Sequence, residues 1–302
     1  MTFAIHRHKW TKREKRQNRF SWAFMAPILI YTTVLGMVPI FAAVVLSFTD
    51  YNGFTKLHFI GLRNYQDFFT GFFKAGGNGR IVLNTIGVSA VIMLLGMVIS
   101  FLLALVLKRI AGKNAYRTIY YIPCIISTAV MAQIMSAFLN PSTGLINSVM
   151  QSMGIAPTVW QSSTFWMFFW IVFLCIWQGL GGSIIFFLAG LMSVPEELYE
   201  AAEMDGAGRV AKMLHVTIPC MKPMLSYILI TSCIGIFNIF VPVQLISNGA
   251  PKGGTMVLYL KIYNDAYQNF ELGASSAVSV LVLIFVMAIT VLNMKVTKLK
   301  LD

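Results

Sequence analysis

Five long stretches of this 302-residue chain contain no Asp, Glu, Lys, Arg or His, and this feature limits most strongly the folds open to it. A helix needs about 20 mostly apolar residues to cross a bilayer. Each stretch is long enough for one crossing, and the longest is long enough for two. Charged residues make up only 11% of the chain, against about 25% in ordinary soluble domains. The sequence therefore predicts an all-α membrane protein with six transmembrane helices. The stretches are 20–49, 81–107, 118–195, 223–251 and 272–294.

The six predicted spans are separated by charged or turn-forming segments. Residues 140–163, between the third and fourth spans, carry no charge and predict an outside loop with a short helix at the membrane surface. Residues 1–19 carry seven basic side chains, but the apolar run after them is too long for a signal peptide, so we expect a retained first span. We place the spans at 22–48, 82–107, 119–139, 165–191, 224–247 and 273–293.

The distribution of basic residues predicts the orientation of the chain in the membrane. With the N-terminus inside, the inside segments hold 17 of the 23 Lys and Arg residues and the outside segments hold 6. Because basic residues accumulate in cytoplasmic loops, we expect a multi-pass protein of the cell (inner or plasma) membrane, in contact with lipid, with both termini cytoplasmic. The net charge of +12 lies in these connecting segments, so we expect no nucleic-acid partner.

None of the six predicted spans contains an Asp, Glu, Lys, Arg or His residue. Ion-coupled carriers and proton pumps usually keep one within the membrane, so energy for active transport would have to enter through another chain. Glycines in the fourth span predict either a hinge along a pathway or a site of close helix packing, and Pro27 predicts packing. The four cysteines have no metal-ligand spacing, so we read them as apolar packing residues and expect no metal site. The glycines are Gly179, Gly181 and Gly182.

The predicted cytoplasmic loop 192–223 differs from the rest of the chain. Five of the eleven acidic residues fall between positions 196 and 205. Ser193 followed by Glu196 is a capping-box pattern, and Gly206 is a typical helix stop, so we expect a helix of about three turns between them. A second short helix should end near the residue before Pro219.

The predicted first helix of this loop has two unlike sides. Its slim side suits docking into a groove on a partner protein, and an ordinary solvated helix is the alternative that the residues leave open. Leu198, Ala201, Ala202 and Asp205 share the slim side, and Glu196, Glu200 and Glu203 share the other.

These residues also carry a resemblance to a known family. The loop is similar to the cytoplasmic signature of permease subunits of binding-protein-dependent ABC importers, in the carbohydrate (maltose, multiple-sugar or glycerol-phosphate type) group. Val216 and Ile218 are conservative departures, and the family often has an aromatic residue where this chain has Met213. The matching residues are Glu200-Ala201-Ala202, Asp205-Gly206-Ala207 and Val216-Thr217-Ile218-Pro219, with further similarity at Gly61-Leu62-Arg63-Asn64-Tyr65 and Asn84-Thr85.

The resemblance implies a type I ABC importer permease fold and a set of partners. These are a second homologous permease, two cytoplasmic ATPase subunits and an extracellular or periplasmic solute-binding protein. The chain itself would bind no cofactor, and the ATPase would use ATP and Mg. The implied organisation is a basic cytoplasmic tail at 1–21, the first span and outside loop at 22–80, the permease domain with five spans and the coupling loop at 81–294, and a cytoplasmic tail at 295–302.

The resemblance also assigns roles to residues of the loop. Glu200 would face a basic residue of the ATPase, Ala201 and Ala202 would allow close approach, and Gly206 would set the turn. Asp205 and Pro219 belong to the same ATPase-coupling signature.

The implied solute is an oligosaccharide or a related polyol, and glycerol-phosphate carriers look similar. Four polar or aromatic residues in the spans are candidates for lining its route, with bonding or packing between helices as the alternative: Trp177, Gln178, Asn238 and Gln244.

Two other classes of function compete with an importer permease, which is not itself an enzyme. An ATP-independent channel or carrier would leave the acidic loop unexplained. A membrane enzyme would need a pattern such as a nucleophile elbow, a His cluster or paired carboxylates near a membrane face, and the sequence has none of these. It also lacks the G-x-x-x-x-G-K-[ST] phosphate-binding loop, so another chain would have to hydrolyse ATP.

Overall fold

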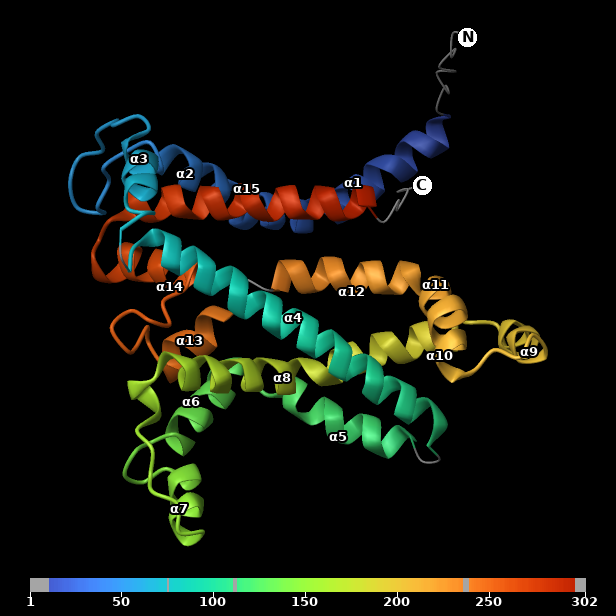
Figure 1. The fold of residues 1–302 in the computed structure, drawn as a ribbon. Coiled ribbons are helices and arrows are strands. Elements are labelled where there is room, and N and C mark those ends of the chain that lie inside the picture. The colour runs from blue at the N-terminus through green and yellow to red at the C-terminus, as the bar shows by residue number, and fades with distance from the viewer. Residues whose placement is uncertain (1–10, 75, 111–112, 236–238, 297–302) are drawn as a thin grey trace.

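The computed structural model describes residues 11–74, 76–110, 113–235 and 239–296, and within them the chain is helical (Figure 1). The elements are α1 (Lys12–Thr32), the π-turn η1 (Thr33–Met37), α2 (Val38–Leu46), α3 (Arg63–Thr70), α4 (Asn78–Arg109), α5 (Lys113–Ile125), α6 (Thr128–Phe138), α7 (Leu145–Ser152), the 3-10 turn η2 (Trp160–Ser162), α8 (Thr164–Met192), α9 (Glu196–Met204), α10 (Arg209–Lys212), the π-turn η3 (Met213–Thr217), α11 (Ile218–Cys220), α12 (Lys222–Gly235), α13 (Phe240–Ile246), α14 (Leu258–Tyr263), the π-turn η5 (Asn264–Gln268) and α15 (Leu272–Val296).

Four helical segments of the described chain are long and apolar enough to cross a membrane, and two bent helix pairs bring the number to as many as six. The first, second, fourth and sixth predicted spans correspond to α1–α2, α4, α8 and α15. The helix of the first span begins at Lys12 and so extends into the basic segment. The fifth span corresponds to α12 and α13, on either side of residues 236–238, which lie outside the described part of the chain.

The third predicted span, 119–139, is present as a bent pair of helices, α5 and α6. The axes of α5 and α6 differ by 90° across Ile126 and Ser127. Pro123 lies one turn before this break, and Ser127 has an extended ψ of 133°. The break exposes a backbone carbonyl that a bilayer could not satisfy, and the Gln178 side chain of α8 donates to it, with 2.7 Å between Nε2 and the Ile126 oxygen.

Two prolines follow directly on π-turns. The Val38 amide bonds to the Thr33 carbonyl just before Pro39, and the Ile218 amide bonds to the Met213 carbonyl just before Pro219. A proline has no N–H to donate and its ring clashes with the carbonyl four residues back. The wider π-turn shifts the bonding register at this point, so both helical runs continue past their prolines.

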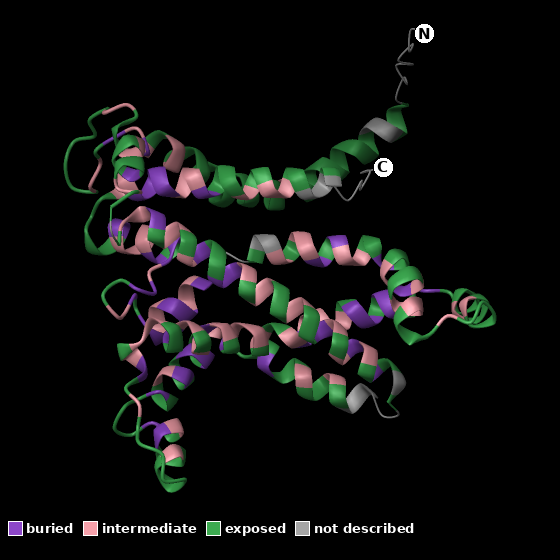
Figure 2. Ribbon diagram, in the orientation of Figure 1, coloured by how far each residue is buried: buried purple, intermediate pink, exposed green. Residues whose placement is uncertain are grey.

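The helices pack mainly around α8 and α15 (Figure 1). α2 packs on α15, α4 packs along α8, and α5, α12 and α13 also contact α8. The largest apolar cluster joins α8 to α6 and α13 and includes Met167, Ile171 and Val243, which are fully buried. Figure 2 shows that α1 and α2, by contrast, are exposed around most of their surface. Their large apolar side chains therefore face lipid or another chain. Pro27 is exposed as well, so the packing predicted for it is not made within the described part of this chain.

The molecule has two distinct ends. At the basal end, α1 begins, α15 ends and the loop α9–α11 projects, while the distal end carries α3, α7 and α14 (Figure 1). The predicted short helix of segment 140–163 is present as α7. Its buried Asn147 accepts from the Thr158 amide and from Trp160 Nε1 (3.1 and 3.2 Å) and so closes the loop after α7.

Candidate functional site

The acidic helix of the predicted coupling loop is α9, which extends from Glu196 to Met204. The predicted capping box is wrong. Ser193 belongs to the end of α8, where its hydroxyl donates to the Gly190 carbonyl at 2.8 Å. Pro195 occupies the N-cap position instead, with an extended ψ of 135° and no side-chain capping bond. Glu196 and Glu197 in the first turn favour the helix through its dipole.

Gly206 ends α9 in the way that its sequence predicts. Its φ is +74°, a left-handed conformation that favours glycine. The Gly206 amide bonds to the Glu203 carbonyl and the Ala207 amide to the Ala202 carbonyl, both at 2.9 Å. These two bonds form a Schellman motif, which satisfies the last carbonyls of α9 and reverses the chain toward α10.

The signature residues lie on the outside of the molecule. Glu200, Ala201, Asp205, Gly206 and Pro219 are exposed and Ala202 is half-buried. α9 stands away from the helix bundle at the basal end (Figure 1). The slim side of α9 is therefore open, as docking into a groove requires, and the role of each residue in docking stays a prediction.

The second helical run of the loop continues further than expected. α10, η3 and α11 follow one another without a break from Arg209 to Cys220, so the predicted stop before Pro219 is wrong. The π-turn η3 explains the difference. It shifts the hydrogen-bond register one residue before Pro219, so the amide that proline lacks does not end the helix. This run then meets α12 at a bend of 71°.

Two sets of contacts hold α9 in place. Lys212 forms an ion pair with Glu203, and the hydrogen bond and charge of Lys212 lower the pKa of the Glu203 carboxyl. The Tyr199 hydroxyl lies 2.9 Å from the Thr217 hydroxyl, and the Lys108 ammonium lies 5.1 Å from the centre of the Tyr199 ring. The loop is thus fastened both to itself and to the end of α4.

A cavity of about 410 Å³ lies within the bundle, against the break between α5 and α6. Its wall is mostly apolar but contains several hydroxyl and amide side chains, and it is called the polar cavity below. α4, α8 and α12 supply most of its wall. No Asp, Glu, Lys, Arg or His is among its described lining residues, so all of its hydrogen-bonding side chains are neutral. Its hydroxyl and amide side chains are Ser89, Ser100, Thr128, Gln178, Ser183 and Ser232.

Ser100 is the most informative of these residues. Its side chain is 1% exposed, and its Oγ has no hydrogen-bond partner among the described residues. A buried hydroxyl without a partner is unfavourable, and the adjoining cavity is where a solute or water could satisfy it. Sequence reasoning missed the five hydroxyl residues, because serines and threonines in a membrane helix can equally bond to their own backbone.

The four predicted route residues are not brought together. Gln178 lines the polar cavity. Trp177 instead lines a largely apolar groove of about 730 Å³ between α4 and α8, because one residue along a helix turns the side chain by roughly 100°. Gln244 is half-buried on α13 and is not among the residues that line the polar cavity. Asn238 lies outside the described residues.

Of the three glycines of α8 that the sequence singled out, one lies at a close helix contact. A Cβ on Gly181 would lie 2.6 Å from the Tyr120 carbonyl oxygen of α5, so this position is one of close helix packing. Gly179 lines the polar cavity and has nothing within 4 Å of a Cβ position, and Gly182 is equally open. The packing role therefore belongs to Gly181.

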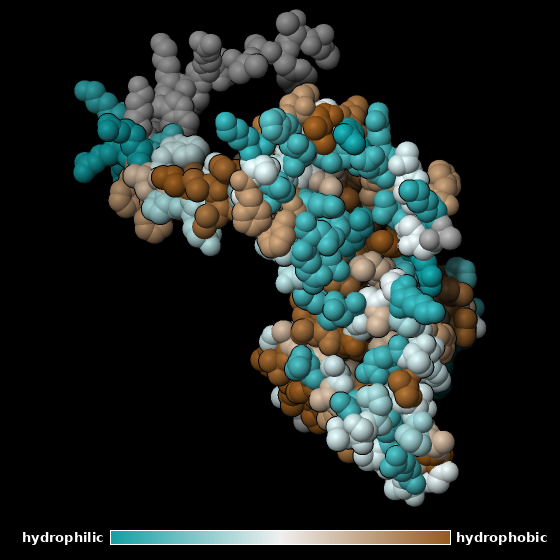
Figure 3. Space-filling model, turned by 90° about the vertical axis from the view of Figure 1, so that its left-hand side faces the viewer, coloured by the Kyte–Doolittle hydropathy of each residue, from teal (hydrophilic) through white to brown (hydrophobic). Residues whose placement is uncertain are grey.

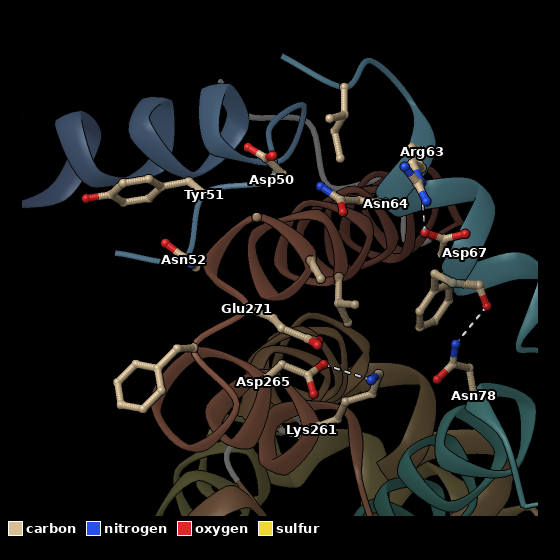
Figure 4. A pocket seen from close by; sticks show the side chains of 16 residues that line it. Asp50, Tyr51, Asn52, Arg63, Asn64, Asp67, Asn78, Lys261, Asp265 and Glu271 are labelled. Atoms are coloured by element: carbon tan, nitrogen blue, oxygen red, sulfur yellow. Dashed lines mark hydrogen bonds and ion pairs between the residues drawn. The ribbon is translucent and has the colours of Figure 1, made fainter. Parts of the chain in front are cut away.

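A second polar pocket of about 440 Å³ lies at the distal end (Figure 4). Lys261 pairs with the largely buried Asp265 at 2.7 Å, and Asn64 bonds to the Ser47 and Thr49 carbonyls at 2.9 and 2.8 Å. Figure 3 looks at this end and shows hydrophilic side chains gathered over it. Through its two bonds, Asn64 holds the segment after α2 in place. The described residues contain no group of three His, Cys, Asp or Glu suited to a metal.

Asn84 and Thr85 have a similar structural role. Asn84 Nδ2 donates to the Gly254 and Met256 carbonyls at 2.9 and 3.0 Å. Thr85 accepts from the Leu258 amide at 2.9 Å. Both residues fasten the segment before α14 to the start of α4.

Residues 96–297 match the family described as "Binding-protein-dependent transport system inner membrane component". The chain is 31% identical to the "Probable ABC transporter permease protein YesP" of Bacillus subtilis (strain 168), over 93% of this chain and 91% of that protein. It is also 31% identical to the "Arabinooligosaccharides transport system permease protein AraP" of the same organism, over 91% of this chain and 88% of that protein.

A solved structure has the same fold. It is a chain of the "bacterial alginate ABC transporter in complex with alginate pentasaccharide-bound periplasmic protein", with a TM-score of 0.78, 23% identity and coverage of 95% of this chain and 98% of that one. The likeness at this identity concerns the fold, which is that of the type I permeases.

Proposed function

The chain belongs to the family of binding-protein-dependent transport system inner membrane components, and on that premise we propose that it forms half of the translocation pathway of an ATP-driven importer for a sugar or oligosaccharide. Members of this family are membrane permease components and not enzymes. The observation that carries the proposal is the exposed, slim α9, which ends at the left-handed Gly206 and stands clear of the bundle. An isolated channel has no use for such a loop.

The proposed assembly contains a second, homologous permease and two ATPase subunits. The ATPases bind α9 in a groove, where Glu200 meets a basic residue and Ala201 allows close approach. ATP and Mg are used by the ATPase, and this chain binds neither. The basal end, with both termini, is cytoplasmic, and this orientation agrees with the distribution of basic residues.

The proposed solute is neutral and rich in hydroxyl groups. The polar cavity supports this choice, because Ser100 and Gln178 offer a donor and acceptor set without a charge. Hydrogen bonds in apolar surroundings are stronger than in water, whereas an anionic solute would need a cationic partner there. The name of the relative AraP, an arabinooligosaccharide permease, points to the same class of solute.

The distal end is the proposed docking surface of the solute-binding protein. Its polar pocket includes Asp50, Asp265 and Glu271 beside Lys261. Such a mixture of charges on a concave surface favours a polar, reversible contact.

The test is purification of the tagged chain from mild detergent, followed by identification of the chains that accompany it and by uptake assays in liposomes. Recovery of a second permease and an ATPase, with uptake that depends on ATP and on the binding protein, is the expected result. Recovery of this chain alone, with solute movement in the absence of ATP, would contradict the proposal and support an ATP-independent channel or carrier.

A further inference from the structure

Tyr199 connects the exposed helix α9 to the membrane-spanning helices. α9 contains no buried residue, but Tyr199 is half-buried. Its side chain packs against an apolar cluster at the basal ends of α4, α8 and α12, which includes Leu107, Leu188 and Met221. Because α9 otherwise projects from the bundle (Figure 1), this side chain is a point at which a movement of α9 would press on the bundle itself.

Lys108, in the last turn of α4, is the first polar partner of Tyr199. Its ammonium lies 5.1 Å from the centre of the Tyr199 ring, within the range in which a cation is attracted to an aromatic face. The same ammonium donates to the Leu191 carbonyl oxygen at the end of α8, at 3.2 Å. Lys108 therefore joins α9, α4 and α8 at a single charged group.

Thr217 is the second polar partner of Tyr199. The two hydroxyl oxygens are 2.9 Å apart, and Thr217 is 3% exposed. The Thr217 hydroxyl also lies 3.3 Å from the Lys212 carbonyl oxygen, to which it donates. The phenol thus fixes α9 to the π-turn η3, while its ring faces the end of α4.

The helices that Lys108 joins are also those that line the polar cavity, since Ser100 belongs to α4 and Gln178 to α8. Closely packed interiors transmit displacements through contiguous contacts. We infer that Tyr199 is the positioning residue through which a movement of α9 reaches the cavity, with Lys108 as its link to α4 and α8. This inference rests on the proposed function, in which the ATPase moves α9.

The test compares Tyr199→Leu with Tyr199→Phe in the assembled transporter. Tyr199→Leu removes both polar partners and keeps an apolar side chain, whereas Tyr199→Phe keeps the ring beneath Lys108. We expect Tyr199→Leu to retain the ATPase and its hydrolysis of ATP. The amount of solute imported per ATP should fall about five-fold or more, because coupling between two sites usually amounts to at least this factor. Tyr199→Phe should keep much of the wild-type ratio of imported solute to hydrolysed ATP.

Lys108→Met should lower the same ratio, and its combination with Tyr199→Leu should be little worse than either change alone, because the two residues act through one contact. Tyr31→Leu is the matched control, since Tyr31 lies on α1, 61% exposed and far from this loop in the sequence. It should leave the ratio unchanged.

Two results would overturn the inference. One is an unchanged ratio of solute to ATP in Tyr199→Leu. The other is loss of the ATPase from purified Tyr199→Leu, which would make Tyr199 part of the docking surface. Failure of the proposed function is distinct from both, because it would be seen in the wild-type chain as uptake without ATP.

Discussion

Substitution of Gly206 by valine tests the coupling loop most directly. Gly206 has a φ of +74°, and nothing lies within 4 Å of the position that a Cβ would occupy. The effect of Gly206→Val therefore comes from backbone strain and not from a clash. A non-glycine residue in this left-handed region costs about 1–2 kcal/mol, and a β-branched one costs at least as much. A cost of that size lowers the equilibrium ratio of the native loop conformation to its alternatives about 5- to 30-fold.

α9 has little to offset this strain. It is nine residues long, has no buried residue, and depends on the Schellman motif for its C-terminal end. Helices this short are unstable on their own. We expect Gly206→Val to uncouple the transporter, so that ATP is still hydrolysed while uptake in proteoliposomes falls, by at most the 5- to 30-fold change in that ratio.

Two matched variants separate backbone strain from other effects. Gly206→Asn should retain most of the uptake, because asparagine tolerates the left-handed conformation. Gly208→Val places the same side chain two residues later, where φ is −68° and the Cβ position is also open, and it should be nearly neutral. Normal uptake in Gly206→Val would refute the reasoning, as would a Gly206→Asn variant that is impaired as severely as Gly206→Val.

Three further changes test other parts of the structure. Charge reversal in Glu200→Lys should reduce the ATPase that co-purifies with the chain, and the loss should shrink as salt is raised, because exposed charges are screened; unchanged co-purification would remove this assignment. Gly181→Ala should destabilise the detergent-solubilised protein by about 1–3 kcal/mol through overpacking against α5, which would be measured as a lower unfolding temperature. Gly182→Ala should not lower this temperature, and equal effects of the two changes would contradict the packing role of Gly181. Ser100→Ala removes no hydrogen bond within the described protein, so the stability of the protein should be unchanged. The KM of uptake should rise about 2- to 10-fold if the hydroxyl bonds the solute, and an unchanged KM would place the solute elsewhere.

The motifs shared with the family are not all functional sites. Asn64 and Asn84 stand out in the sequence as parts of a resemblance, and the structure gives both of them a role in holding the chain. Asn64 bonds to two carbonyls at the end of the first span, and Asn84 bonds to two carbonyls more than 150 residues away in the sequence. These bonds satisfy buried backbone groups, so their loss should affect folding before transport.

The sequence by itself determined the class of the protein and the position of its acidic loop. Both follow from local properties, because a charge-free run of about 20 residues has few alternatives to a membrane helix, and a glycine after a short acidic helix favours a left-handed stop. The spans that correspond to α4, α8 and α15 and the turn at Gly206 were confirmed for this reason.

Only the tertiary structure decided which residues share a cavity and where the helices break. Ile126 and Ser127, where α5 and α6 meet at 90°, give no strong sequence signal, and the carbonyl left free there is satisfied by Gln178 from another helix. In the same way, Trp177 and Gln178 are neighbours in sequence but face different spaces. Hydrophobic periodicity cannot resolve these choices in a membrane, because almost every side of a spanning helix is apolar and the distinction between lipid, neighbouring helix and cavity arises only when the helices pack together.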